Sequence, residues 1–121
     1  MKYPAAYREV LAVTATNNND QITYYSLEGP EVDANSPGGA RERTDKRILS
    51  TYLGDWYGLG SGTSQAAAHV TGALALKLQQ QRALSLDDVR WLLQRTATVL
   101  MGYARTQQGW GLIAVEAYIA G

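Results

Sequence analysis

An apolar helix directly behind a glycine-rich turn constrains this chain more than any other feature. Residues 58–64 read Gly-Leu-Gly-Ser-Gly-Thr-Ser, and the segment from Ser64 to about Gln81 contains no proline and a single glycine, Gly72. Small and aliphatic side chains occur on all sides of it between Ala66 and Leu78. Because a helix that is apolar all round is buried between other layers, we expect a buried central helix starting at Ser64.

The first half of the chain reads as short strands separated by turns. The runs rich in β-branched, aliphatic and aromatic residues are 10–13, 22–25, 32–34 and 48–51. Asn and Asp at 17–20 and Pro-Gly-Gly at 37–39 predict turns. The charged run 41–47 contains both signs, which is typical of a solvated surface loop.

The second half is predicted to be helical. Beyond the central helix, Ser85 and Asp88 form a capping box that opens an amphipathic helix. Residues 112–119 predict a short closing strand–helix element. Strands that alternate with helices are typical of an α/β fold with a parallel sheet. We therefore expect one α/β unit over residues 1–121.

Composition excludes several functions. The 121 residues carry 11 basic and 11 acidic side chains, so the net charge is zero and nothing favours a nucleic acid or an anionic membrane as partner. The apolar runs are shorter than the roughly 20 residues of a membrane helix. There is no cysteine and one histidine, His69. A mechanism that uses a histidine base must therefore take it from His69 or from another chain.

The glycine-rich turn does not match a phosphate-binding motif. A P-loop requires Gly-Lys-Ser/Thr, and the dinucleotide fingerprint fails because Thr63 stands at its third glycine position. A G-x-S-x-G nucleophile elbow is approached only by Ser61 between Gly60 and Gly62. Two interpretations of Ser64 remain: its hydroxyl caps the helix, or it is a nucleophile beside free helix N–H groups that stabilise an oxyanion.

The longer string carries a family resemblance. Residues 62–72, Gly-Thr-Ser-Gln-Ala-Ala-Ala-His-Val-Thr-Gly, resemble the nucleophile motif G-T-S-M-A-x-P-H-V-x-G of subtilisin-like serine proteases, with Gln65 for Met and Ala68 for Pro. Residues 3–13 are similar to the family's Y-P-A-x-Y-x-x-V-I-A-V, and residues 25–33 to F-S-S-x-G-P-E-L-D. Segments 36–38, 48–51 and 109–113 also match in order. The chain is thus identified as the C-terminal, nucleophile-bearing part of a subtilase (peptidase S8) domain, with its three-layer fold.

The resemblance implies specific roles. Ser64 is the nucleophile, its backbone N–H is an oxyanion donor, and Thr63 supports that donor site. Tyr25 and Gln65 lie on the leaving-group side of the scissile bond. The substrate is a polypeptide, the chemistry requires no cofactor, and by family habit the protein is secreted.

The same resemblance leaves the triad incomplete. The family order Asp, His, Ser places two catalytic residues and the oxyanion Asn before the point matched by Tyr3. His69 cannot replace the missing base, because five helical residues separate it from Ser64 by about 140° and about 7.5 Å along the axis. We expect His69 to be a packing residue, and the chain to need a missing N-terminal half or to self-associate.

Two acidic residues suggest a cation site. Glu31 and Asp33 are two positions apart, and on a strand such residues share a face. The resemblance adds the backbone carbonyls of Ala5, Tyr7 and Val10 to a weak structural Ca²⁺ or monovalent cation site. The alternative is a surface acid pair without an ion.

Two functions follow for the chain as a whole. One is a serine endopeptidase whose Asp, His and Asn come from sequence or a chain not present here. The other is a catalytically inactive subtilase fragment that acts as a binding or assembly module.

Overall fold

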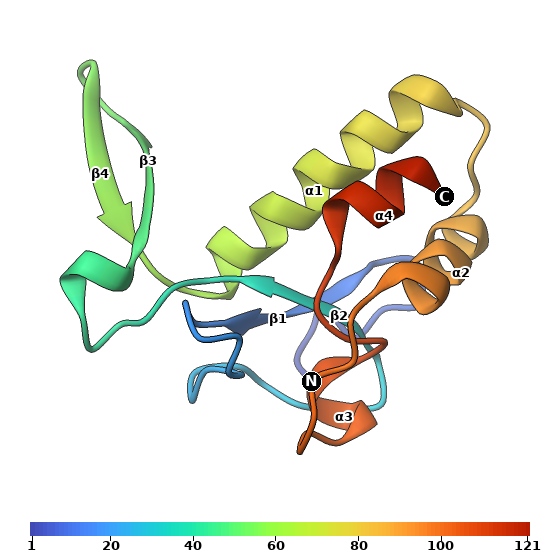
Figure 1. Ribbon diagram of the computed structural model, residues 1–121, viewed down its shortest axis with the longest axis horizontal. Coiled ribbons are helices and arrows are strands. Elements are labelled where there is room, and N and C mark those ends of the chain that lie inside the picture. The colour runs from blue at the N-terminus through green and yellow to red at the C-terminus, as the bar shows by residue number, and fades with distance from the viewer.

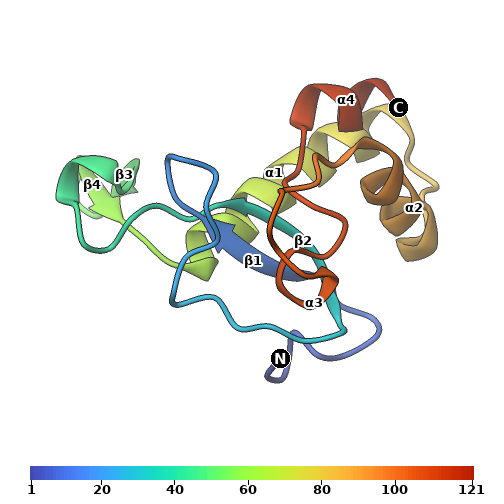
Figure 2. The same cartoon turned by 60° about the horizontal axis from the view of Figure 1, so that its bottom comes forward.

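A computed structural model describes residues 1–121. The elements in chain order are β1 (Ala12–Thr16), β2 (Val32–Pro37), the 3₁₀ turn η1 (Thr44–Lys46), β3 (Ile48–Tyr52), β4 (Trp56–Gly60), α1 (Thr63–Gln80), α2 (Leu86–Thr96), α3 (Arg105–Gln108) and α4 (Val115–Ala120). Figures 1 and 2 show α1 and α4 on one side of β1 and β2, and α3 on the other side. This is the mixed α/β arrangement with a parallel sheet that the sequence predicts.

The central sheet is small and parallel. β1 and β2 pair in parallel from Ala12↔Val32 to Thr16↔Pro37, with an irregularity between Ala12 and Val13. The closing segment adds only an isolated parallel bridge between Asn35 and Leu112, in place of the short strand predicted there, and the predicted helix follows as α4. The strand predicted at 10–13 lies later, because Val10 closes a turn with its N–H on the Tyr7 carbonyl (3.1 Å).

The strand predicted at 22–25 is wrong. Only Ile22 forms an isolated bridge, with Thr16, and the next residues turn away. One side chain and one backbone group replace a strand here: the Ser26 hydroxyl accepts the Ala15 N–H (2.8 Å), and the Thr23 N–H donates to the Ala15 carbonyl (2.9 Å). These bonds satisfy the edge of β1 without a third strand.

α1 is buried along one face only. Ala66, Val70, Ala73 and Lys77 are buried, whereas the side chains between them are exposed or half-buried. The buried face packs on β1 and β2, and α4 lies beside α1 (Figure 1). Because α1 is apolar on all sides, part of its apolar surface is left exposed by the elements that pack on it.

The core joins α1, α2, α4 and β2. Its buried members are Ala34, Val70, Ala73, Val89, Leu92, Leu93, Ile113 and Tyr118. α2 begins as predicted, because Ser85 Oγ accepts the Asp88 N–H (3.1 Å) and the Asp88 carboxylate accepts the Ser85 N–H (2.9 Å). The Ser85–Asp88 capping box is thus confirmed.

A hairpin stands away from this core. β3 and β4 pair antiparallel from Ile48↔Gly60 to Tyr52↔Trp56, and Figure 1 shows them projecting from the rest of the chain. Trp56 and Tyr57 are 73% and 74% exposed. The strand at 48–51 was predicted, but β4 was not, because its glycines read as a turn. No helix of the chain has the length and apolarity needed to cross a membrane.

Candidate active site

Ser64 lies in the first turn of α1 with its side chain exposed. The N-cap of this helix is Gly62, and no side chain forms a capping hydrogen bond. The interpretation of the Ser64 hydroxyl as a helix cap is therefore wrong. Gly62 is the N-cap residue and has an extended backbone conformation. The Ser64 hydroxyl, two residues later, forms no hydrogen bond.

Three N–H groups without an acceptor lie in the same helical turn as this hydroxyl. The first helical hydrogen bond runs from the Ala66 N–H to the Gly62 carbonyl (3.3 Å), and the N–H groups of Thr63, Ser64 and Gln65 precede it without an acceptor in the chain. The positive end of the helix dipole lies at the same place. Such donors can stabilise an oxyanion that develops next to Ser64 Oγ.

The turn before Ser64 is fixed to the sheet. The Gly62 N–H donates to the Gly38 carbonyl (2.9 Å), directly after β2. Gly38 has no room for a side chain, because a Cβ there would lie 2.4 Å from Ala15 Cβ and 2.7 Å from the Gly62 carbonyl oxygen. This close approach joins the end of β2 to the start of α1.

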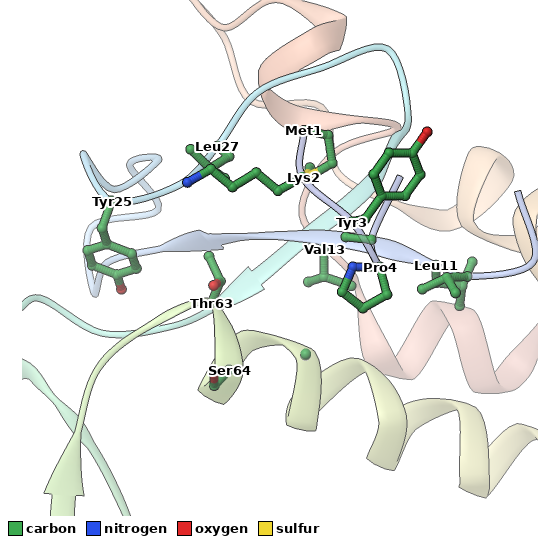
Figure 3. Close-up of a pocket in the computed structure, with 13 residues that line it drawn as sticks. Met1, Lys2, Tyr3, Pro4, Leu11, Val13, Tyr25, Leu27, Thr63 and Ser64 are labelled. Atoms are coloured by element: carbon green, nitrogen blue, oxygen red, sulfur yellow. The ribbon is translucent and has the colours of Figure 1, made fainter. Parts of the chain in front are cut away.

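A mostly apolar hollow of about 480 Å³ opens beside the first turn of α1. Thr63, Ser64 and Tyr25 line it together with apolar residues of the N-terminal segment and β1. Figure 3 shows Thr63 and Ser64 leaving the first turn in different directions, with the Tyr25 ring across from Thr63. The hollow can accept an apolar side chain next to the serine.

Tyr25 and Gln65 approach the same turn from two sides. The Tyr25 hydroxyl donates to the Gly39 carbonyl, and burial raises the pKa of this phenol. The Gln65 side chain folds back over the turn, since a Cβ on Gly60 would lie 2.8 Å from Gln65 Nε2. The structure thus brings Thr63, Ser64, Gln65 and Tyr25 together around one turn.

Arg41 is a member of this neighbourhood that sequence reasoning missed. Its guanidinium carbon lies 4.5 Å from the centre of the Tyr25 ring. The run 41–47 was interpreted as a solvated loop, and Arg41 is indeed exposed. Charge pattern alone does not reveal that the turn after β2 leads this residue back to Tyr25 and Gly62.

His69 is exposed on α1, so within residues 1–121 it is not the packing residue expected from the sequence. Its Nδ1 lies 2.9 Å from the Gln65 carbonyl oxygen of its own helix. This contact holds the ring on the helix surface, one turn and more beyond Ser64. His69 therefore remains excluded as a base for Ser64.

The residues predicted to hold a cation lie beside an arginine, Arg90. β2 begins at Val32, so Glu31 precedes the strand, yet it lines one small pocket together with Asp33 and Arg90. Asp33 Oδ1 accepts Arg90 Nε (2.9 Å) and Asp33 Oδ2 accepts the Ala12 N–H (2.9 Å).

The predicted carbonyl ligands are also engaged. The Val10 carbonyl accepts Arg90 Nη2 (3.1 Å), and the Tyr7 carbonyl accepts the Val10 N–H (3.1 Å). Only Glu31 and the Ala5 carbonyl remain without a hydrogen bond, and no three acidic or histidine side chains gather around one point. A guanidinium supplies a positive charge beside Asp33, and the cation site stays a prediction.

Comparison with known proteins gives the family. Residues 1–111 match the family described as the subtilase family, Peptidase_S8. The chain is 39% identical over 118 residues to the minor extracellular protease Epr of Bacillus subtilis (strain 168), covering 97% of this chain and 17% of that protein. It is 39% identical over 115 residues to subtilisin E of the same organism, covering 95% and 28%.

Solved structures agree. A protease of Pseudoalteromonas arctica PAMC 21717 superposes with a TM-score of 0.86 at 30% identity, over 98% of this chain and 37% of that one. Fervidolysin from Fervidobacterium pennivorans, a keratinolytic enzyme related to subtilisin, gives a TM-score of 0.82 at 28% identity, over 98% and 20%. The chain belongs to the subtilase family, whose members are serine proteases. It spans between one sixth and two fifths of the length of these four proteins.

Proposed function

We propose that the chain supplies the nucleophile of a subtilisin-like serine endopeptidase. Ser64 Oγ attacks the carbonyl carbon of a peptide bond and forms an acyl-enzyme, and the Ser64 N–H donates to the resulting oxyanion. Thr63 supports this donor site, and Tyr25 and Gln65 border the leaving group. The observation that carries the proposal is the exposed Ser64 hydroxyl in a helix turn capped by Gly62.

The proposal requires residues beyond this chain. A serine alone has no base to accept its proton, and His69 faces away. The aspartate, histidine and oxyanion asparagine come from further sequence or from a partner chain. Residues 1–121 are then part of one catalytic domain, and its substrate is a polypeptide.

Two relatives are named as extracellular proteases. We extend this location to the protein that contains residues 1–121.

A fluorophosphonate probe tests the role of Ser64. The chain alone is expected to react no faster than Ser64→Ala, because triad members act as a unit and loss of one costs up to about a millionfold in rate. Mixing the chain with the separately produced upstream part of subtilisin E is expected to give labelling at Ser64. Ser61→Ala, which changes a serine of the same turn, should label like the unaltered chain.

The outcomes separate clearly. Stoichiometric labelling of Ser64 in the chain alone would contradict the need for a partner. An assembled complex that stays unlabelled would contradict the nucleophile itself.

A second candidate function rests on α1. Its outer face is apolar but exposed, with Leu76 at 49% exposure. A catalytically inactive fragment could use this face to bind or assemble with another chain. An assembled but unlabelled complex in the same experiment would favour this second function.

A further inference from the structure

An unpaired arginine lies beside the nucleophile turn. Arg41 is exposed, and no carboxylate of the chain forms an ion pair with it. Its neighbour Arg43, in contrast, pairs with Asp45 (Nη2 to Oδ2, 3.0 Å). Arg41 is therefore a cation of this loop that is available to a ligand.

Stacking orients this guanidinium. Its carbon lies 4.5 Å from the centroid of the Tyr25 ring, within the range of a cation–π contact. The Tyr25 hydroxyl is in turn fixed by its hydrogen bond to the Gly39 carbonyl. A flexible side chain is thus held against a ring that borders the hollow beside Ser64.

Gly62 locates the guanidinium relative to the serine. A Cβ placed on Gly62 would lie 3.1 Å from Gln65 Oε1, 3.7 Å from Arg41 Nη2 and 3.8 Å from the Ser64 backbone nitrogen. Arg41 and Gln65 therefore approach the first turn of α1 on the same side as the Ser64 N–H. Because Gly62 is buried and has no side chain, both side chains can approach the turn this closely.

We propose that Arg41 selects substrates with an aspartate or glutamate directly after the scissile bond. This inference rests on the proposed function, which puts Tyr25 and Gln65 on the leaving-group side. A carboxylate next to Tyr25 accepts hydrogen bonds from the planar guanidinium, a geometry that favours Arg over Lys. Glu42 is exposed beside Arg41, but it forms no ion pair with it, so the guanidinium keeps its donors.

A binding experiment tests this without requiring catalysis. N-acetyl-glutamyl-alanine amide and its neutral twin N-acetyl-glutaminyl-alanine amide are titrated into the ¹⁵N-labelled chain, and the amide signals of Gly62, Ser64 and Gln65 are followed. Exposed ion pairs contribute little, so we expect the glutamyl peptide to bind about two- to fivefold more tightly. Raising the salt concentration should reduce this ratio.

Two matched variants complete the test. Arg41→Gln should bring the ratio of the two dissociation constants to one, whereas Arg43→Gln, which changes a paired arginine of the same loop, should leave it unchanged. Equal binding of both peptides to the unaltered chain, no detectable binding, or a ratio that survives Arg41→Gln would overturn the proposal. These results leave the role of Ser64 to the probe-labelling experiment, so the two failures are distinguishable.

Discussion

Arg90 Nε lies 2.9 Å from Asp33 Oδ1, and this ion pair joins α2 to β2. The Arg90 Nη2 atom also donates to the carbonyls of Arg8 (2.9 Å) and Val10 (3.1 Å) in the segment before β1. The Asp33 side chain is only 8% exposed. One guanidinium thus connects three separate parts of the chain around a buried carboxylate.

Breaking this pair should destabilise the fold. Arg90→Met leaves Asp33 buried without its main partner, and we expect the free energy of unfolding to fall by about 2 kcal/mol. Arg82→Met, at an exposed position, should change it by less than about 0.5 kcal/mol. Urea unfolding followed by circular dichroism measures both, and equal effects would contradict a structural role for the pair.

Added cations should not stabilise the chain. Because Arg90 already neutralises Asp33 and engages the Val10 carbonyl, we expect the melting temperature to stay unchanged on titration with Ca²⁺ or Na⁺ at constant ionic strength. A concentration-dependent rise with Ca²⁺ alone would show that Glu31 and Asp33 do bind an ion.

Two glycines should respond to alanine in opposite directions. Gly109 has φ +62°, and a Cβ there would lie 2.3 Å from the Asp33 carbonyl carbon. Gly109→Ala should therefore cost about 2 kcal/mol or more. Gly72 lies within α1 with no atom inside 4 Å of such a Cβ, so Gly72→Ala should stabilise by about 0.5–1 kcal/mol. Thermal melts of both variants measure whether each substitution raises or lowers the stability.

The cap of α2 should be sensitive to acid. Hydrogen bonds from the Ser85 side chain and backbone lower the pKa of Asp88 below its ordinary value of 3.8. The ionised carboxylate therefore stabilises the folded state above that ordinary value, and this contribution is lost as the pH falls through the lowered one. Asp88→Asn should be less stable than the unaltered chain near neutral pH and converge with it in acid. The Asp87 carboxylate forms none of these bonds, so Asp87→Asn should change the stability near neutral pH by less.

The exposed face of α1 should promote association. Leu76 is 49% exposed in an apolar helix, and covering such a side chain contributes about 1.5–3 kcal/mol. We expect concentration-dependent association in sedimentation velocity, weakened at least about tenfold by Leu76→Gln and unaffected by Gln80→Ala. A single monomer with a cooperative melt at all concentrations would argue against it.

Much of the fold could be predicted from the sequence because local signals and packing agree. The Ser85–Asp88 box starts α2 and the apolar run forms α1, whereas β1 and β2 pair in parallel without a helix between them in the chain. The match of residues 62–72 to the nucleophile motif indicated the family directly, and the family model confirms it.

The remaining features depend on contacts between distant residues. Nothing near residues 22–25 shows that Thr23 and Ser26 will bond to β1 in place of a strand. The pairing of Arg90 with Asp33, 57 positions apart, is likewise absent from any local pattern. The Arg41–Tyr25 contact escaped for the same reason, because a charged loop gives no sign of where it returns.

The bond between the Gly62 N–H and the Gly38 carbonyl has a consequence for how such a protein can evolve. It fixes both ends of the intervening stretch to the sheet, so residues 39–61 can lengthen, shorten or change charge while the serine stays in place. The loop and the hairpin can therefore vary in sequence and length while the first turn of α1 keeps its place on the sheet.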